Sequence, residues 1–200
     1  MHQDWLKFEK EAKALGYKFI AGIDEAGRGP LAGPVVAAAV ILKSNIQIPG
    51  VNDSKKLTES KRNDLFEIIT NHPDIIYCIS RVEHTTIDEI NILNATLLAM
   101  KQAVDGLSIC PDLLLVDGNK SVNSNIPCRP IVKGDSLSLS IAIASILAKV
   151  TRDQIMDKLH EEMPQYDFKK HKGYPTIKHK LLIQEHGLSK YHRKTFKSSI

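Results

Sequence analysis

The chain has 200 residues, of which 42% are hydrophobic and 25% are charged, values that favour one folded domain over a disordered chain. Its three cysteines, Cys78, Cys110 and Cys128, are odd in number and far apart, which argues against a disulfide framework or a cysteine-based zinc site and favours a reducing compartment. The longest apolar run, Val35–Leu42, is far shorter than the roughly 20 residues that cross a bilayer, and the N-terminus lacks a signal-peptide pattern. We therefore expect an intracellular, cytoplasmic protein.

The net charge of +4 is unevenly divided along the chain. Residues 168–200 hold nine lysines and arginines but a single acid, Glu185, whereas residues 1–167 carry a small excess of acids. Such an asymmetry favours a polyanionic partner such as nucleic acid, although a merely solvated tail has the same composition. Apolar residues are spread through the basic segment, among them Ile177, Leu181 and Phe196, so we expect it to fold back onto the body.

Strand-like and helix-like segments follow one another along the chain. Strands are expected at Lys18–Ile23, Val35–Leu42, Ile75–Ser80, Leu113–Val116 and Pro130–Val132. Helices are expected at Thr58–Thr70 with Thr58 as N-cap, from a Thr86-x-x-Glu89 capping box to Gly106, at Leu137–Glu162, and from Thr176 to Gly187. This order predicts an α/β protein with a mixed sheet.

Three aspartates stand where predicted strands give way to glycine-containing loops: Asp24, Asp117 and Asp135. Because open α/β sheets place ligand sites beyond strand ends, these acids could share one crevice. Crowded carboxylates repel one another unless a hard cation neutralises them, and oxygen-only sites select magnesium or manganese. Two such ions about 4 Å apart can hydrolyse a phosphodiester without a nucleophilic side chain. Solvated loop positions are the alternative, and Asp135 is also placed to cap the helix that follows it.

Glu25 directly follows Asp24. Neighbouring strand residues point to opposite faces, so both acids serve one site only if the strand breaks at Glu25, which the following Ala26-Gly27 turn permits. Other catalytic patterns are absent from the sequence, which contains no G-x-S-x-G elbow and no H-E-x-x-H zinc motif.

The glycines of Gly27-Arg28-Gly29 would let backbone groups approach a ligand closely. A ribose 2′-hydroxyl both donates and accepts hydrogen bonds, and bare backbone groups could recognise it. An ordinary tight turn is the alternative. The stretch Gly27–Ala32 also fits the dinucleotide-binding pattern of a nicotinamide-dependent oxidoreductase, but that pattern requires a helix next, and Pro30, Gly33-Pro34 and β-type residues follow instead.

Basic and aromatic residues accompany the acids. Lys55 and Lys56 precede a predicted helix, Lys149 and Arg152 lie one turn apart on the long helix, and Tyr174 follows a lysine-rich run. Lysine and arginine can neutralise phosphates, and a tyrosine ring can stack on a nucleotide. Solvated lysines and a packed tyrosine are the alternatives.

Taken together, these motifs resemble the bacterial type 2 ribonucleases H, the ribonuclease HII family. The resemblance runs from about Ile20 to Arg193 and rests on Asp24–Val35, Asn52–Leu57, Asp117–Asn119, Lys133–Ser136, Ala144–Asp153 and His171–Thr176. It implies a ribonuclease H-like fold, a mixed sheet flanked by helices, with a catalytic core at 1–167. The small basic helical segment at 168–200 would form one wall of the substrate groove.

The resemblance also implies a metal-dependent endonuclease that hydrolyses the RNA strand of RNA–DNA hybrids and cleaves 5′ to single ribonucleotides in duplex DNA, leaving 3′-hydroxyl and 5′-phosphate ends. It makes Asp24, Glu25, Asp117 and Asp135 the acidic tetrad that binds Mn²⁺ or Mg²⁺. Gly27, Arg28 and Gly29 would contact the 2′-hydroxyl, and Tyr174 the sugar of the deoxynucleotide that follows. We expect phosphate contacts from Lys55, Lys56, Lys149 and Arg152. We further expect a monomer that makes no membrane contact. The competing hypothesis is a non-catalytic nucleic-acid-binding protein, for which the basic segment would suffice.

Overall fold

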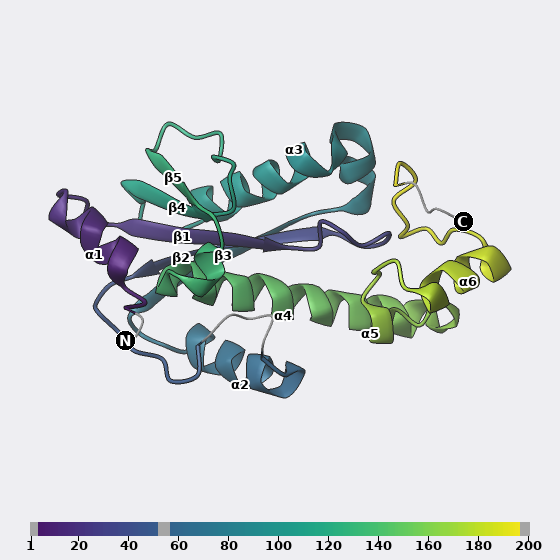
Figure 1. Ribbon diagram of the computed structural model, residues 1–200. Helices are drawn as coiled ribbons and strands as arrows, with labels where there is room; N and C mark the ends of the chain where they lie inside the picture. Colours follow the sequence, from purple (N-terminus) through teal and green to yellow (C-terminus); the bar gives the residue numbers. More distant parts are fainter. Residues whose placement is uncertain (1–3, 52–56, 197–200) are drawn as a thin grey trace.

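A five-stranded mixed sheet forms the centre of the computed structural model, which describes residues 4–51 and 57–196 (Figure 1). The strands are β1 (Ile20–Ala26), β2 (Val35–Leu42), β3 (Ile75–Val82), β4 (Leu113–Asp117) and β5 (Cys128–Ile131), in the order β3-β2-β1-β4-β5. β1 pairs antiparallel with β2 and parallel with β4. β2–β3 pairs antiparallel and β4–β5 parallel, so the mixed sheet is confirmed.

Helices cover both faces of the sheet. One face carries α3 (His84–Asp105), and the other carries α4 (Leu139–Glu162) and α2 (Glu59–Thr70) (Figure 1). Side chains of β2 alternate between the two layers: Ala37, Ala39 and Ile41 pack on the α3 side, while Val36, Ala38 and Val40 pack on the α4 side. This double coverage explains why the apolar run of β2 is buried along its whole length.

Helix α4 lies unusually close to β1. A Cβ atom on Gly22 would come within 2.3 Å of the Ser140 Oγ, so only glycine permits this approach. The helix begins after Ser138, whose hydroxyl accepts a hydrogen bond from the Ile141 N–H. Ser138, not Asp135, is therefore the N-cap, and Asp135 lies in the preceding 3-10 turn η2 (Gly134–Ser136).

Helix α3 differs from the prediction at its start. It begins at His84, so the expected capping box at Thr86 is wrong. The backbone leaves helical geometry at Asn91 (φ 66°, ψ 165°), where the Asn91 Oδ1 accepts hydrogen bonds from the N–H groups of Leu93 and Asn94. The local cap therefore acts within the helix, at a kink that separates a short first part from a longer second part.

The two ends of the molecule are formed by short helices. α1 (Lys7–Ala14) lies at one end, and α6 (Ile177–His186) lies at the other (Figure 1). Near α6, η3 (Pro164–Tyr166) and α5 (Phe168–His171) pack against α4. Thr176 caps α6, as predicted, by accepting a hydrogen bond from the His179 N–H. Within residues 4–51 and 57–196, no helix combines the length and the apolar character needed to cross a membrane.

Candidate active site

Three of the four predicted acids meet at one edge of the sheet. Carboxylate oxygens of Asp24, Asp117 and Asp135 lie within 4.8 Å of one another. Asp24 stands near the end of β1 and Asp117 ends β4, and these neighbouring strands run parallel, so their carboxyl ends coincide. The η2 turn brings in Asp135, because the N–H groups of Gly134 and Asp135 donate to the Asp117 Oδ1 at 2.6 and 3.5 Å.

The three acids, which we call the acidic cluster, have the electrostatics of a cation site. Asp24 and Asp135 are buried. Burial, followed by the negative charges of Glu25 and Asp117, raises the pKa of Asp24 well above its usual value, while hydrogen bonds from Ser145 and the Glu25 N–H act in the opposite direction. Two oxygens bonded at about 2.1 Å on opposite sides of a divalent cation lie about 4.2 Å apart, so oxygens within 4.8 Å of one another need only a small inward shift to share one ion. The spacing and the oxygen-only donor set therefore fit a divalent metal ion.

Glu25 lies outside this cluster. A site shared by Asp24 and Glu25 was expected only if the strand broke at Glu25. β1 instead continues through Ala26, with Glu25 paired to Ala37. The two acids consequently point to opposite faces: Asp24 follows the α4-facing side of the strand and Glu25 the α3-facing side. The Glu25 carboxylate forms an ion pair with Arg28 at 3.4 Å and still borders the same cleft as Asp24.

A cleft of about 490 Å³ joins the acids to the glycine motif. It is lined by Asp24, Glu25 and Asp117, by Gly27–Gly29, by Tyr174 and Lys149, and by two residues that the sequence analysis did not single out, Arg62 and Ser145. Ser145 precedes Lys149 by one helical turn, and that spacing could have indicated it. β2, and not a helix, follows the glycine motif, so the dinucleotide-binding interpretation is wrong.

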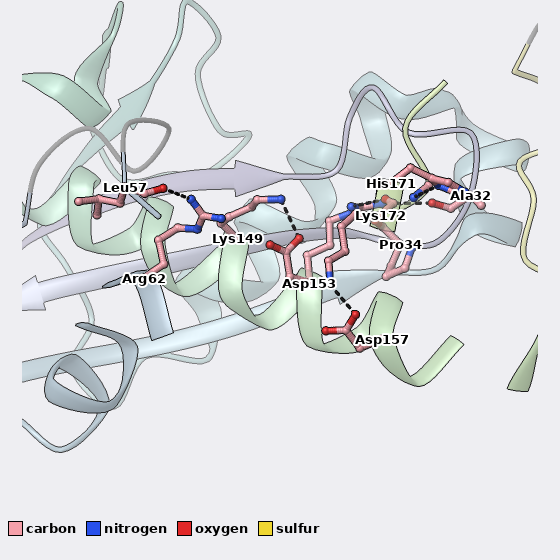
Figure 2. Close-up of polar contacts among 11 residues, drawn as sticks. Ala32, Pro34, Leu57, Arg62, Lys149, Asp153, Asp157, His171 and Lys172 are labelled. Atoms are coloured by element: carbon pink, nitrogen blue, oxygen red, sulfur yellow. Dashed lines mark hydrogen bonds and ion pairs between the residues drawn. The ribbon is translucent and has the colours of Figure 1, made fainter. Parts of the chain in front are cut away.

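Tyr174 and Lys149 face the glycine motif across the cleft. A Cβ atom on Gly29 would lie 3.8 Å from the Tyr174 ring, and Tyr174 as a residue is 40% exposed. The Lys149 ammonium lies 5.8 Å from the centre of this ring and 2.7 Å from the Asp153 Oδ1, as Figure 2 shows for the Lys149–Asp153 pair. Lys55 and Lys56, the other predicted phosphate contacts, lie outside the residues that the structure describes.

Arg152 does not lie where a phosphate contact requires it. Its side chain is fully buried, and its guanidinium donates to the carbonyls of Pro34 at 3.1 Å, Lys172 at 2.9 Å and Ala32 at 3.1 Å. The prediction of a phosphate contact is therefore wrong for Arg152, since this guanidinium cannot reach solvent without abandoning three buried acceptors. It supports the glycine motif from behind, where a Cβ atom on Gly27 (φ +101°) would approach the Arg152 Nε to 2.2 Å.

A second buried guanidinium completes the support. Arg193 donates to the carbonyls of Gly27 at 2.6 Å, Arg28 at 3.1 Å and Gly33 at 3.0 Å. Burial lowers the pKa of Arg152 to about 10 and that of Arg193 to about 9, values at which both groups are still charged at neutral pH. Two cations from distant parts of the chain thus fix the carbonyls of the loop 27–34 and hold its backbone rigid beside the acids.

Ion pairs extend this order along α4 toward the C-terminal segment. Lys172, which directly follows α5, pairs with Asp157 on α4, and Figure 2 shows this pair two helical turns beyond Lys149. The carbonyl of the same lysine accepts a hydrogen bond from Arg152. Tyr174, two residues further on, is therefore held against α4 as well as against the glycine motif.

Comparison with known proteins agrees with this geometry. The family model described as ribonuclease HII matches residues 21–199. A protein of Syntrophus aciditrophicus named ribonuclease HII is 55% identical over 190 residues, which cover 95% of this chain and 89% of the relative. Another of that name, from Caldicellulosiruptor saccharolyticus, is 51% identical over 198 residues, with coverages of 99% and 96%.

A solved structure leads to the same family. The crystal structure of the ribonuclease H2 from Pyrococcus horikoshii matches with a TM-score of 0.75 and 27% identity, covering 90% of this chain and 95% of that chain. The five-stranded mixed sheet with helices on both faces is a ribonuclease H-like fold, as the resemblance implied. A non-catalytic binding protein and a nicotinamide-dependent oxidoreductase are both excluded by these relationships. The chain belongs to the ribonuclease HII family, the metal-dependent endonucleases of ribonuclease H type.

Proposed function

We propose that this ribonuclease H hydrolyses the RNA strand of RNA–DNA hybrids and cleaves 5′ to single ribonucleotides embedded in duplex DNA, leaving 3′-hydroxyl and 5′-phosphate ends. The observation that supports the proposal best is that one cleft of about 490 Å³ joins Asp24 and Asp117 of the acidic cluster to the glycine motif Gly27–Gly29. Chemistry at the acids and recognition at the glycines can therefore act on adjoining atoms of one substrate.

The acidic cluster, with Glu25 beside it, would hold two divalent cations, Mg²⁺ or Mn²⁺. When bound, such ions activate water and stabilise the oxygen that departs from a phosphodiester. The protein's own contribution is to fix the carboxylates in advance. The Gly134 N–H holds Asp117, and the Ser145 hydroxyl and the Glu25 N–H hold Asp24. No side-chain nucleophile is required in this arrangement.

Recognition of the ribonucleotide would fall to the loop that the two arginines support. Arg193 fixes the Gly27 and Arg28 carbonyls, so the backbone at the cleft cannot adjust to a poorly matched ligand. A rigid backbone that offers both donors and acceptors suits a 2′-hydroxyl, which is itself both. The Tyr174 ring would pack on the next deoxyribose, and Lys149 would neutralise a phosphate. In this proposal, residues 168–200 form one wall of the substrate groove.

The substitution Asp24→Asn tests the catalytic half of the proposal. It removes a cation ligand with almost no change in side-chain volume. Losing a group that only orients a metal ligand costs up to about 100-fold in activity, so losing the ligand itself should lower hydrolysis by more than that. Binding of an RNA–DNA hybrid, measured by fluorescence anisotropy, should persist.

Asp64→Asn is the matched control, because Asp64 is exposed on α2, away from the cleft. It should cleave at the wild-type rate. Unimpaired turnover by Asp24→Asn at saturating Mg²⁺ or Mn²⁺ would contradict the proposed role of Asp24.

A further inference from the structure

Three buried histidines lie directly behind Tyr174, and the proposed chemistry uses none of them. His171, His179 and His192 are 8%, 0% and 1% exposed. The rings of His171 and His179 stack with their centres 4.0 Å apart, and the rings of Tyr166 and Phe168 pack around them. Imidazoles buried to this degree are packed core groups unless their ring nitrogens carry out a specific task, so the partner of each nitrogen matters.

Backbone partners determine which nitrogen of His192 carries the proton. The Ser189 N–H, which can only donate, lies 2.9 Å from the His192 Nδ1, so this nitrogen accepts and is unprotonated. The Ser189 hydroxyl, 2.6 Å from the same nitrogen, donates to it as well. A neutral His192 therefore carries its proton on Nε2. That N–H points to the His179 Nε2 at 3.0 Å, which must then accept.

The series of hydrogen bonds continues through His179 to Tyr174. Because its Nε2 accepts, a neutral His179 carries its proton on Nδ1 and donates to the Tyr174 carbonyl at 2.9 Å. One arrangement of protons thus satisfies the whole series from Ser189 through His192 and His179 to Tyr174. We call this series the histidine relay. Both of its ends are backbone groups, whose roles as donor and acceptor cannot change.

His171 holds the other side of the same segment. Its Nδ1 accepts from the Gly173 N–H at 3.1 Å, so its Nε2 donates to the Tyr166 carbonyl at 2.6 Å. The Gly173 carbonyl in turn accepts from the Leu31 N–H at 2.7 Å, within the arginine-supported loop. The backbone at residues 173 and 174 is therefore fixed between the histidines and the glycine motif.

We propose that His179 and His192 are positioning residues, which fix the Tyr174 carbonyl through two neutral imidazoles and so hold the Tyr174 ring opposite Gly29. The proposal rests on the proposed function, in that Tyr174 is taken to recognise the nucleotide beside the ribonucleotide. Neutrality is essential to the relay. A proton added to the His192 Nδ1 would face the Ser189 N–H, and a proton added to the His179 Nε2 would face the His192 N–H.

The surroundings keep both imidazoles neutral. The titratable groups that face the relay are His171 of α5, Tyr166 of η3 and His84 of α3. Beyond His171 lie His160 of α4 and the ion pair between Asp167 and Lys178. Burial first, and then the neighbouring histidines, lowers the pKa of His192 to about 4. Burial likewise lowers the pKa of His179 to about 4. At neutral pH the relay is therefore intact.

The positions of the protons can be measured without any substrate. Long-range ¹H–¹⁵N spectra of the full chain at pH 7 should show His192 and His171 protonated at Nε2 and His179 protonated at Nδ1. A His179 protonated at Nε2, or a charged His179 or His192, would overturn the proposal. This result does not depend on activity, so it tests the relay even if the proposed function fails.

A pair of substitutions similar in size tests the link to recognition. His179→Asn keeps an amide N–H near the position of Nδ1, whereas His179→Leu has a similar volume and no donor. The quantity compared is kcat/KM on a duplex with one ribonucleotide divided by kcat/KM on an RNA–DNA hybrid, because both reactions use the same acidic cluster. His179→Leu should lower this ratio about two- to tenfold, the cost of one hydrogen bond, mainly through KM. His179→Asn should recover most of it. Equal ratios for the two variants would overturn the proposal, whereas a wild-type enzyme that cleaves neither substrate would contradict the proposed function instead.

Discussion

The sheet edge that carries the acids and the C-terminal segment that carries Tyr174 are positioned in different ways. Asp24 and Asp117 occupy the ends of adjacent parallel strands, so the sheet itself places them. Tyr174 lies in a short connection between α5 and α6, and buried polar side chains hold it there. Backbone topology thus positions the acids, whereas long-range polar contacts position Tyr174. The two regions should therefore fail separately when mutated.

The largest expected effect is the loss of catalysis on every substrate. Asp135→Asn should lower hydrolysis of a hybrid and of a single-ribonucleotide duplex by the same factor, more than about 100-fold, because both reactions need the same cation site. Steady-state cleavage of the two substrates measures this. Asp105→Asn, at a mostly exposed position on α3, is the control and should behave as wild type. Loss on one substrate alone would show that the acids also take part in recognition.

The second largest expected effect is the loss of stability on removing the buried Arg193 guanidinium, which supports the loop 27–34. Arg193→Met leaves the Gly27, Arg28 and Gly33 carbonyls without their donor, and one buried unsatisfied group costs about 1–3 kcal/mol. We expect a loss of about 3 kcal/mol in the free energy of unfolding, measured in urea, together with a lower preference for the single ribonucleotide. Lys101→Met, whose ammonium is exposed and pairs with the exposed Asp105, should leave the stability nearly unchanged. Equal stabilities of the two variants would contradict the assigned role of Arg193.

Mildly acidic pH should lower the free energy of unfolding through the buried histidines of the C-terminal segment. The pKa of His192 is about 4 in the folded protein and 6.5 ordinarily, so its contribution to stability is complete above about pH 6.5 and is lost as the pH falls toward 4. Each such histidine should reduce the folding equilibrium constant by up to about tenfold per pH unit in this range. Urea unfolding of wild type and of His192→Leu between pH 4 and pH 7 measures the effect. Parallel pH dependences of the two proteins would contradict it.

The smallest predicted effect concerns the tyrosine ring itself. Tyr174→Ala should lower the preference for a single ribonucleotide about two- to tenfold, in line with the worth of one aromatic contact, and leave hybrid cleavage less affected. Tyr174→Phe keeps the ring and should retain the preference. A preference that is unchanged in Tyr174→Ala would remove this residue from the recognition site.

The sheet and the acids could be predicted because their signals are local. Apolar runs such as Val35–Leu42 indicate buried strands, and acids directly after such runs indicate a site at the sheet edge. Helix α1 was not predicted, because its apolar positions are few. The predicted start of α3 is wrong because the residue that caps it, Asn91, lies inside the helix, where no terminal sequence motif indicates it.

The two arginines that support the loop 27–34 could not be predicted from one sequence. Arg152 looks like any helical arginine until its acceptors are known, and the Ala32 carbonyl lies 120 positions away in the chain. The acceptor of Arg193 at Gly33 is 160 positions away. The histidines of the basic segment likewise have no ligand spacing, because their task depends on backbone groups that only the fold brings together.

The proposed function requires that acids distant in the sequence bind a cation at a single site. A crystal grown with Mn²⁺ and measured at the manganese absorption edge tests it directly. We predict an anomalous peak about 2.1 Å from carboxylate oxygens of Asp24, Asp117 and Asp135. If this position shows no peak at saturating Mn²⁺, or if only one of the three acids contacts the ion there, the acids do not form a single cation site.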